Sequence, residues 1–403
     1  MHLLRLASAL SSVSLTLAWA TYIVPHSAGN DDTPALAAAF FADPKLATNA
    51  TILFEQGVTY NILTPIRFPY FENVLVSVQG NLTYAANIQN TQAIVGSSDF
   101  PGHWFTFTGG SNVTLEGSED PQWGWVDSHG QQWWDAMQEV SLRVNRPHGW
   151  GFQKITNGEI KYMKLWQPVA WSFSASGSKN LHIHHNTIIA ISNNKTCLIG
   201  FAAQGTNLLF EDNTIFNGDD CLTVGSPADN IHFRNSYCNG GHGLSIGSLG
   251  KGGAVADVRN VLIENIDIDD SLYGARFKSW AGGKGTARNV TWKDIRMKKV
   301  RLPLGPKPKS TTANSTLIDT FTFENFRGTI DDNTNPGVSG ATGKEVAIFD
   351  LYQGTAKAII AKNVSMTTLS GAPVTVICDS TVITTDVGFK CWNGLFQPTA
   401  VGE

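Results

Sequence analysis

Two adjacent carboxylates are the residues of this sequence best suited to acid–base chemistry. Asp219 and Asp220 stand side by side in the run Asn217-Gly-Asp-Asp-Cys221. Two close carboxyl groups push their pKa values apart, so that one can hold a proton while the other is ionised. Neighbours on a regular strand point to opposite faces, so the pair serves one site only where the backbone bends. Pairs of adjacent aspartates also occur in surface turns, so other functional side chains nearby are needed to identify a catalytic site.

A histidine and two cations follow the carboxylates along the chain. His242 lies in Gly240-Gly-His-Gly243, where the glycines would let the main chain approach a ligand closely and leave the imidazole unobstructed. Arg276 and Lys278 are two positions apart and would share one face of a strand, with Phe277 pointing into the core. In a chain with so few charges this cation pair suits the binding of a carboxylate, which Arg can hold through two hydrogen bonds.

A repeated sequence pattern predicts the architecture that positions these residues. Asparagine followed by alternating apolar and polar residues recurs at intervals of 23–30 residues, starting at Asn180, Asn207, Asn230, Asn260 and Asn289. The alternation indicates strands with one buried face, and a repeat of this length without a helical pattern is typical of a β-solenoid, whose coils bury their apolar faces by stacking. We expect the repeated asparagines to form amide ladders at the bends. A β-sandwich is the competing architecture.

The two ends of such a solenoid need covers, and the cysteines need partners. We expect a short helical N-terminal cap from Asp31 to about Asp43 and a C-terminal cover around Cys378–Cys391. Of the five cysteines, near neighbours are favoured as partners by the entropy of loop closure. This predicts the disulfides Cys221–Cys238 and Cys378–Cys391 and leaves Cys197 free.

Composition and charge exclude several classes of protein. The 403 residues include 29 Lys and Arg against 33 Asp and Glu, and only 15% are charged while 42% are hydrophobic. This balance excludes a disordered chain and a basic protein that binds nucleic acid. No uninterrupted apolar run of about 20 residues follows Trp19, so we expect no membrane-spanning segment. We expect residues 21–403 to form a single domain.

The first twenty residues are predicted to be a secretory signal peptide. A weakly basic start precedes an apolar stretch, and Ala18-Trp-Ala20 fits a cleavage site. We therefore expect a secreted, extracellular, monomeric glycoprotein. The candidate N-glycosylation sites are the Asn-x-Ser/Thr sequons at Asn49, Asn81, Asn112, Asn194, Asn289, Asn314 and Asn363.

Taken together, the motifs resemble glycoside hydrolase family 28, the polygalacturonase family. The resemblance rests on Gly-Asp-Asp-Cys at 218–221, Gly-Gly-His-Gly-Leu-Ser-Ile-Gly-Ser at 240–248, Arg-x-Lys at 276–278 and the upstream Gly-Gln-Gln-Trp-Trp-Asp at 130–135. It covers most of the chain and implies an all-β fold, a single-domain right-handed parallel β-helix, in agreement with the repeats. It also implies hydrolysis of α-1,4 bonds in pectic galacturonan with inversion of configuration, and we expect neither a cofactor nor a metal ion.

The resemblance implies a role for each candidate residue. Asp219 matches the general acid that protonates the glycosidic oxygen, Asp220 matches a carboxylate that activates water, and His242 matches the histidine that tunes the acid. Arg276 and Lys278 match the groups that bind the substrate carboxylate. The carboxyl groups of an inverting site are about 6.5–9.5 Å apart, which leaves room for the water. Because the net charge is −4, local cations must attract the polyanionic substrate.

One acidic group of the family pattern is missing. The family carries Asn-Thr-Asp one coil before the Asp pair, where this chain has Thr196-Cys-Leu-Ile-Gly200 with Leu198 at the place of the carboxylate. No carboxylate lies between Glu159 and Glu211. Three explanations remain open: Asp220 alone suffices as the base, the substrate specificity has changed, or activity has been lost.

Aromatic residues upstream bear on the mode of attack. The stretch Trp123–Trp134 and the run Arg146-Pro-His-Gly-Trp150 could line or wall off one end of the cleft, where aromatic faces stack on sugar rings. The alternative is that these tryptophans belong to the core or its rim, which is the more common position of tryptophan. We therefore predict exo-action, as in fungal exo-polygalacturonases (galacturan 1,4-α-galacturonidases). The alternatives are an endo-polygalacturonase, a rhamnogalacturonan hydrolase and a non-catalytic protein that binds cell-wall polysaccharide.

A histidine cluster lies outside these motifs. His182 and His184 would share one strand face, and His185 follows them directly. A metal site is conceivable here, but the alternation favours a solvent-exposed face, and we predict no metal site.

Overall fold

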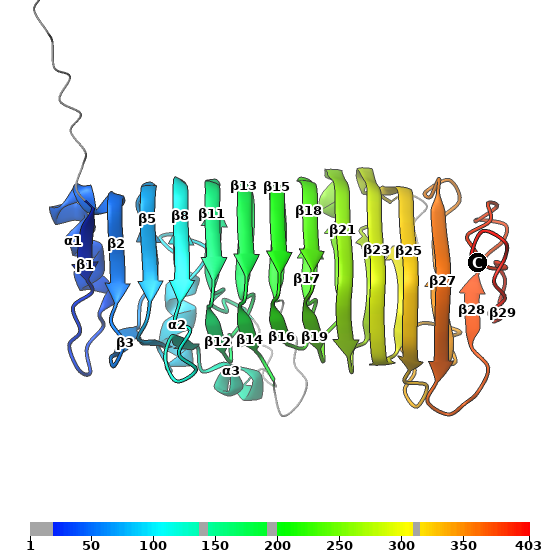
Figure 1. The fold of residues 1–403 in the computed structure, drawn as a ribbon, viewed down its shortest axis with the longest axis horizontal. Coiled ribbons are helices and arrows are strands. Elements are labelled where there is room, and N and C mark those ends of the chain that lie inside the picture. The colour runs from blue at the N-terminus through cyan, green and yellow to red at the C-terminus, as the bar shows by residue number, and fades with distance from the viewer. Residues whose placement is uncertain (1–18, 137–143, 192–199, 309–314) are drawn as a thin grey trace, which may run out of the picture.

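The chain winds into one long parallel β-helix (Figure 1). The computed structural model describes residues 19–136, 144–191, 200–308 and 315–403. Equivalent strands of successive coils pair in parallel, as β13 (Phe173–His184) does with β15 (Phe201–Glu211). The expected solenoid is therefore confirmed, and the β-sandwich is excluded.

The solenoid has three faces, each formed by one parallel sheet. The first, here called the long sheet, contains the strands of the asparagine repeats and faces the viewer in Figure 1. Besides β13 and β15 it contains β1 (Ala20–Ile23), β2 (Thr48–Phe54), β5 (Phe71–Val78), β8 (Gly110–Gly117), β11 (Ile155–Lys161), β18 (Ala228–Arg234), β21 (Val255–Asp269), β23 (Lys284–Val300), β25 (Leu317–Ile330) and β27 (Ile359–Thr368).

The other two faces are made of shorter strands. The cleft sheet contains the first residues of β13 and β15 together with β4 (Ile66–Phe68), β7 (Phe105–Phe107), β10 (Trp150–Gln153), β17 (Leu222–Val224), β20 (Leu244–Leu249), β22 (Tyr273–Ser279), β24 (Leu302–Pro308), β26 (Glu345–Phe349) and β28 (Thr375–Cys378). The third sheet contains β3 (Thr59–Ile62), β6 (Asn81–Tyr84), β9 (Trp125–Asp127), β12 (Lys164–Trp166), β14 (Thr187–Ile189), β16 (Thr214–Phe216) and β19 (Tyr237–Asn239).

Stacked asparagines fix the register between coils, as expected. Asn207 Nδ2 donates to Asn180 Oδ1 at 2.8 Å, and Asn230 Nδ2 donates to Asn207 Oδ1 at 3.0 Å. Their φ angles lie between 54° and 57°, a left-handed conformation that Asn adopts more readily than most residues. The same contact joins Asn289 to Asn260 at 2.7 Å. Each coil is thereby held at a set position relative to the next.

The interior is filled by side chains that stack along the axis of the solenoid. The rings of Phe105 and Trp150 lie 3.9 Å apart and nearly parallel, and those of Phe152 and Phe173 lie 6.4 Å apart. Buried apolar residues of all the coils form one continuous core. A core of this kind holds the outward-facing residues of neighbouring coils at fixed spacing, about 4.8 Å per coil.

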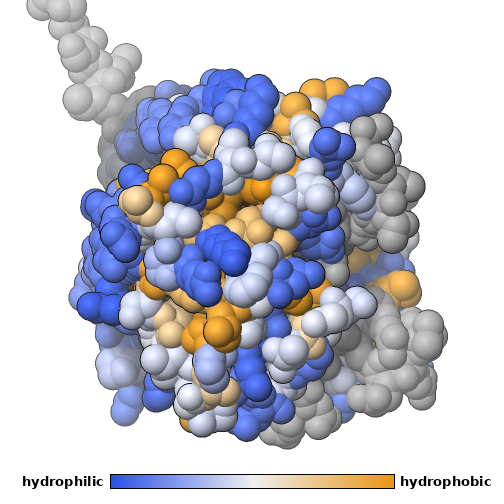
Figure 2. All heavy atoms as spheres, turned by 90° about the vertical axis from the view of Figure 1, so that its right-hand side faces the viewer, coloured by the Kyte–Doolittle hydropathy of each residue, from blue (hydrophilic) through white to orange (hydrophobic). Residues whose placement is uncertain are grey.

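Helices and disulfides cover the ends and corners. The predicted N-terminal cap is confirmed as α1 (Thr33–Ala42), followed by the 3-10 helix η1 (Pro44–Ala47). Both predicted disulfides, Cys221–Cys238 and Cys378–Cys391, are present, and β29 (Gly394–Leu395) pairs antiparallel to β28 at the C-terminal end. Figure 2 looks onto that end, where hydrophobic and hydrophilic residues are interspersed. Within the described ranges, the remaining helices are α2 (Ile88–Val95), α3 (Gly130–Ala136) and η3 (Lys251–Gly253).

Several of the predicted features lie outside the described residues. Residues 1–18 of the predicted signal peptide, Cys197, Leu198 and the sequons Asn194 and Asn314 lie outside the described residues. Among the described residues, none of the helices is both long enough and apolar enough to span a bilayer.

Candidate active site

The two adjacent carboxylates lie at the bend between β16 and β17. Asn217 Nδ2 donates to the carbonyl oxygen of Asp220 at 2.9 Å, and the amide of Asp220 donates to Asp219 Oδ1 at 2.7 Å. These contacts turn both carboxyl groups to one side, so that an oxygen of each lies within 4.8 Å of the other. The side chain of Asp219 is 24% exposed and that of Asp220 is 1% exposed. Asp219 therefore faces the cleft, and Asp220 lies beneath it.

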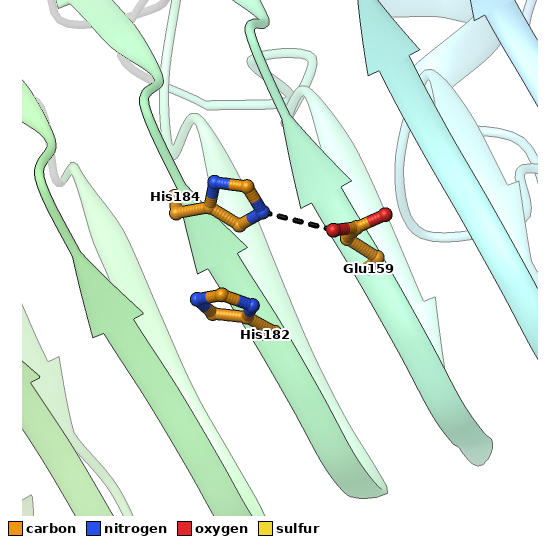
Figure 3. Close-up of side chains that lie close together, drawn as sticks. All are labelled: Glu159, His182 and His184. Atoms are coloured by element: carbon orange, nitrogen blue, oxygen red, sulfur yellow. Dashed lines mark hydrogen bonds and ion pairs between the residues drawn. The ribbon is translucent and has the colours of Figure 1, made fainter.

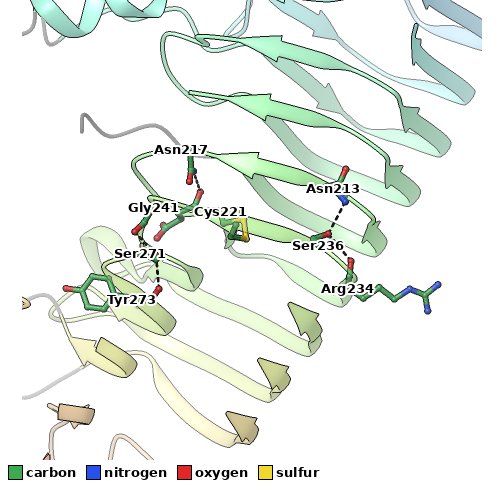
Figure 4. Close-up of a disulfide and its surroundings, with 10 residues drawn as sticks. Asn213, Asn217, Cys221, Arg234, Ser236, Gly241, Ser271 and Tyr273 are labelled. Atoms are coloured by element: carbon green, nitrogen blue, oxygen red, sulfur yellow. Dashed lines mark hydrogen bonds between the residues drawn. A yellow bond between two sulfur atoms is a disulfide. The ribbon is translucent and has the colours of Figure 1, made fainter. Parts of the chain in front are cut away.

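His242 reaches the site from the next coil. Its Nδ1 lies 3.0 Å from Asp219 Oδ1, and its backbone amide donates to the carbonyl of Asp219 at 2.8 Å. A Cβ added to Gly241 would lie 2.2 Å from the carbonyl oxygen of Asp219, and one added to Gly243 would lie 2.2 Å from that of Tyr273. The glycines around His242 thus let neighbouring coils approach each other, whereas the sequence predicts that they give a ligand access. Figure 4 shows this region beside the Cys221 disulfide.

The two cations lie on β22, one coil further along, and both face Asp220. Lys278 Nζ lies 2.5 Å from Asp220 Oδ2, and an Arg276 guanidinium nitrogen lies 3.7 Å from Oδ1. Arg276 also lies over the ring of Tyr273, 4.1 Å from its centroid. Phe277 is buried in the core, as the alternation predicts. The cations that the sequence assigned to the substrate therefore also hold the buried carboxylate.

Ser245 is a site residue that the sequence analysis did not single out. Its hydroxyl donates to Asp220 Oδ1 at 2.5 Å, and the residue is fully buried. The signal was present in the alternation, because Leu244 and Ile246 point into the core and leave Ser245 on the same face as the carboxylates. With Ser245 and Lys278, each oxygen of Asp220 has one hydrogen-bond donor and keeps one free acceptor position.

The environments of the two carboxyl groups shift their pKa values in opposite directions. Burial, the largest influence, raises the pKa of Asp220, and Asp219 adds to this while Lys278 opposes it. Burial also raises the pKa of Asp219, but the hydrogen bond and charge of His242 outweigh it and leave that pKa below its usual value. Asp219 therefore loses its proton more readily than an ordinary aspartate, and its carboxylate accepts the hydrogen bond of His242.

The spacing of the carboxyl groups differs from the expectation for an inverting site. An oxygen of Asp219 and one of Asp220 lie within 4.8 Å. This is closer than the roughly 6.5–9.5 Å between carboxyl groups that usually accommodates the water of an inverting glycosidase. The spacing of this pair therefore does not itself support inversion.

Both carboxylates line a cleft of about 600 Å³ on the cleft sheet. Further along it, His148 stacks on Trp171 with 4.8 Å between ring centroids, and His103 lies 5.7 Å from His148. Burial lowers the pKa of both histidines to about 4, so both are neutral at higher pH. On the other side of the catalytic coils the cleft is lined by Lys251 and Trp280.

Only part of the aromatic stretch predicted to line this cleft does so. His148 lines it, but Trp150 is fully buried in the main core. Trp133 and Trp134 of α3 are also buried, packed against Val169 and Ala190. Trp125 belongs to a separate groove with Trp166 on the third sheet. The prediction was wrong for these tryptophans because sequence proximity to His148 does not place them on the cleft sheet.

The five described sequons lie on strands of the long and third sheets. Asn112, Asn289 and Asn363 are exposed and belong to the asparagine ladders, where each side-chain amide donates to the preceding coil. Asn49 accepts from Asn73, and Asn81 accepts from the backbone amide of Trp125. Their glycosylation stays a prediction.

Comparison with known proteins gives consistent matches over nearly the whole chain. The profile of Glycosyl hydrolases family 28 matches residues 62–368. A probable exopolygalacturonase C of Aspergillus flavus is 33% identical over 91% of this chain and 89% of its own. The protein of that name in Aspergillus terreus is 33% identical over 94% and 93% of the two chains.

Solved structures show the same fold. The endo-xylogalacturonan hydrolase of Aspergillus tubingensis superimposes with a TM-score of 0.78 at 21% identity, over 93% of this chain and 99% of its own. The polygalacturonase of Erwinia carotovora gives a TM-score of 0.62 at 15% identity, over 91% and 99%. These likenesses confirm the parallel β-helix.

Proposed function

Because this chain belongs to glycosyl hydrolases family 28, we propose that it is an exo-acting polygalacturonase, which removes terminal galacturonic acid from α-1,4-galacturonan with inversion of configuration. Family membership makes it a pectin-degrading glycoside hydrolase. The convergence of Asp219, with its partner His242, and the Asp220–Lys278 pair on one cleft carries the assignment of the active site. Inversion rests on the family resemblance, because the carboxyl spacing does not itself support it.

The Asp219–His242 pair supplies the proton of the reaction. Asp219 faces the cleft and is joined to His242 by a 3.0 Å hydrogen bond, so the carboxyl group passes a proton to the glycosidic oxygen and the imidazole is placed to replace it. As the glycosidic C–O bond breaks, its oxygen takes this proton and leaves as a neutral hydroxyl group. General acid catalysis of this kind contributes about 10²–10⁴-fold to the rate.

Asp220 acts on the water. Above its raised pKa it is a carboxylate, and each of its oxygens keeps an acceptor position beside Ser245 or Lys278. The water oxygen bonds to the anomeric carbon from the face opposite the leaving group, and its proton passes to Asp220. In this proposal Asp220 suffices as the base, with Lys278 and Arg276 holding it in place and keeping it ionised.

The substrate carboxylate is bound by the same cations. Arg276 is the better candidate, because its nitrogen is 3.7 Å from Asp220 and its guanidinium plane retains donors for a second carboxylate. Lys251 adds positive charge further along the cleft. His148, neutral above a pH of about 4, offers hydrogen bonds to sugar hydroxyls without adding charge.

Exo-action is supported by the relatives that are named as probable exopolygalacturonases and by the walls that His148, Trp171 and Trp280 add to the cleft. A second candidate, endo-action on a substituted galacturonan, is favoured by the structural likeness to the endo-xylogalacturonan hydrolase. A rhamnogalacturonan backbone stays a third alternative.

A product profile tests the proposal. Purified protein is incubated with polygalacturonate, xylogalacturonan and rhamnogalacturonan, and products are resolved by anion-exchange chromatography. Monomeric galacturonic acid as the only early product supports exo-action, and early oligomers contradict it. ¹H NMR of the first product should show the β-anomer, and an α-anomer would contradict inversion. Asp219→Asn is the inactive control, and wild-type protein inert on all three polymers would make the chain a binding protein.

We further propose that the protein is secreted through its N-terminal signal peptide. The two disulfides support this, because disulfides persist in oxidising compartments. Expression in a fungal host and analysis of the culture medium for protein lacking residues 1–20 tests it.

A further inference from the structure

A cluster of two histidines and a glutamate lies on the long sheet, away from the catalytic cleft. Glu159 on β11 is the register partner of His182 on β13, and His184 lies two residues further along the same strand (Figure 3). One ligand atom of each residue lies within 4.8 Å of those of the other two. The two imidazole rings are stacked, 4.0 Å apart. The sequence predicted a solvent-exposed face without a metal site here, but His184 is buried and Glu159 joins the two histidines. We therefore propose that Glu159, His182 and His184 form a binding site for a divalent transition metal ion such as Zn²⁺.

The donor set fits this class of ion. Two imidazole nitrogens and one carboxylate oxygen are ligands that Zn²⁺, Ni²⁺ and Cu²⁺ accept, whereas Ca²⁺ and Mg²⁺ prefer oxygen alone. The side chains of Glu159 and His182 are 34% and 39% exposed. Solvent therefore reaches the cluster, and water can fill the fourth position of a tetrahedral ion.

Each ligand is already held by a partner on its other side. His182 Nε2 lies 2.6 Å from Glu211 Oε1, so its Nδ1 is the nitrogen turned toward Glu159 (Figure 3). Lys161 holds the second oxygen of Glu159 at 2.9 Å. His184 Nδ1 lies 2.7 Å from the Nδ1 of His185. Such outer partners fix the tautomer and orientation of metal ligands.

The spacing requires only a small adjustment. His184 Nε2 and Glu159 Oε1 are 3.0 Å apart and share a proton in the metal-free protein. Two ligands of a tetrahedral ion, each about 2.0–2.2 Å from it, lie about 3.3 Å apart. The ion thus replaces that proton when the two side chains separate by a few tenths of an ångström.

The same sheet offers a matched control. His232 on β18 stands at the register position of His182, two coils further on, and its Nε2 lies 2.8 Å from Glu264 Oε1. Leu209 and Leu262 occupy this position on the adjacent coils, so the pair has no second imidazole beside it there. An ordinary surface ion pair and the proposed metal site can therefore be compared on one sheet.

The test is titration of the full-length, EDTA-treated protein with Zn²⁺. Binding is measured by calorimetry and by the change in the thermal unfolding midpoint. We expect wild type and His232→Gln to bind one equivalent and to unfold at a higher temperature with Zn²⁺, because binding to the folded state alone stabilises it. His184→Gln and His182→Gln should lose this equivalent. Glu211→Gln should bind at least about tenfold more weakly, since it removes only an outer partner.

Three results would overturn the proposal. These are wild type that binds no Zn²⁺ at millimolar concentration, His182→Gln that binds as tightly as His232→Gln, and loss of the equivalent in Asp219→Asn. The last variant is included because Asp219, Asp220 and His242 also bring three ligand atoms within 4.8 Å. His182 is the more exposed of the two histidines, so its variant carries the test if His184→Gln does not fold.

Discussion

Lys278 Nζ lies 2.5 Å from Asp220 Oδ2, and this ion pair joins two coils that are 58 residues apart in sequence. Asp220 is buried, and Lys278 is only 12% exposed. The charge of Lys278 opposes the effect of burial on the pKa of Asp220. The pair therefore sets the protonation of the proposed base as well as its position.

Replacing Lys278 by Met is expected to move the acid limb of the pH–activity profile to higher pH. Without the ammonium group the pKa of Asp220 rises further, so the carboxylate forms only at higher pH. An unpaired buried charge also destabilises the fold by about 3–5 kcal/mol. The measurements are kcat/KM against pH and urea unfolding.

The matched control for this substitution is Lys298→Met. Lys298 is 71% exposed and lies 3.6 Å from Asp269. Because exposed ion pairs contribute little, this variant should keep the wild-type profile and stability. An acid limb that stays in place in Lys278→Met would show that Asp220 is not the base.

Arg276→Ala is expected to raise KM for polygalacturonate by about 10–100-fold, with a smaller change in kcat. The reason is the loss of charge-assisted hydrogen bonds to the substrate carboxylate, each contributing about 1.5–3 kcal/mol. Arg276→Lys keeps the charge but not the planar guanidinium group, so its KM should lie between those of wild type and Arg276→Ala. Arg288→Ala, on an exposed arginine of β23, should behave as wild type. An unchanged KM in Arg276→Ala would refute the assigned role.

The repeat made most of the fold and the catalytic coils predictable. The asparagine starts set the coil spacing, and coil spacing places Asp220, His242 and the residues of β22 on successive coils. The alternation around Phe277 also predicted which side chains of β22 point away from the core. These are local patterns in the sequence. In a solenoid, residues at equivalent positions of successive coils become neighbours in space, so the patterns are enough to predict this part of the site.

The remainder of the site depends on contacts between weakly repetitive coils. His103 precedes the recognisable repeats, and it meets His148 only because β7 pairs with β10. Trp171 reaches the cleft from the turn before β13. No residue pattern in the sequence predicts the pairing of β7 with β10 or the position of Trp171. The prediction for Trp133 and Trp134 failed for a related reason, since α3 carries them into a small core of its own.

His103 and His148 are expected to make the protein lose stability between pH 6.5 and about pH 4. Burial lowers the pKa of each from 6.5 to about 4. Over this interval the unfolded chain binds protons that the folded chain does not, so stability is complete above pH 6.5 and falls as the pH decreases. Each shift corresponds to a loss of up to about 3 kcal/mol.

The check is the change in thermal midpoint between pH 7 and pH 4.5. His103→Asn and His148→Asn should each show a smaller decrease than wild type, because asparagine does not titrate. His232→Asn, which removes an ordinary surface ion pair with Glu264, should show the wild-type decrease. Equal decreases in all four proteins would contradict the prediction. Because each variant is compared with itself at the two pH values, a loss of stability that is independent of pH does not affect the result.

Gly241→Ala is expected to damage catalysis more than stability alone explains. A Cβ here would lie 2.2 Å from the carbonyl oxygen of Asp219 and 2.4 Å from Asn217 Oδ1, so the bend that aims Asp219 must move. His242 follows directly and donates its backbone amide to that same carbonyl. A displacement of about 1 Å in positioned catalytic groups can cost about 10²-fold in rate. Gly57→Ala is the control, because its φ of 91° is strained for alanine but a Cβ there meets no atom within 4 Å. We expect both variants to lose stability and only Gly241→Ala to lose kcat at a temperature where both are folded, and equal kcat in the two would show that the glycine does not position the acid.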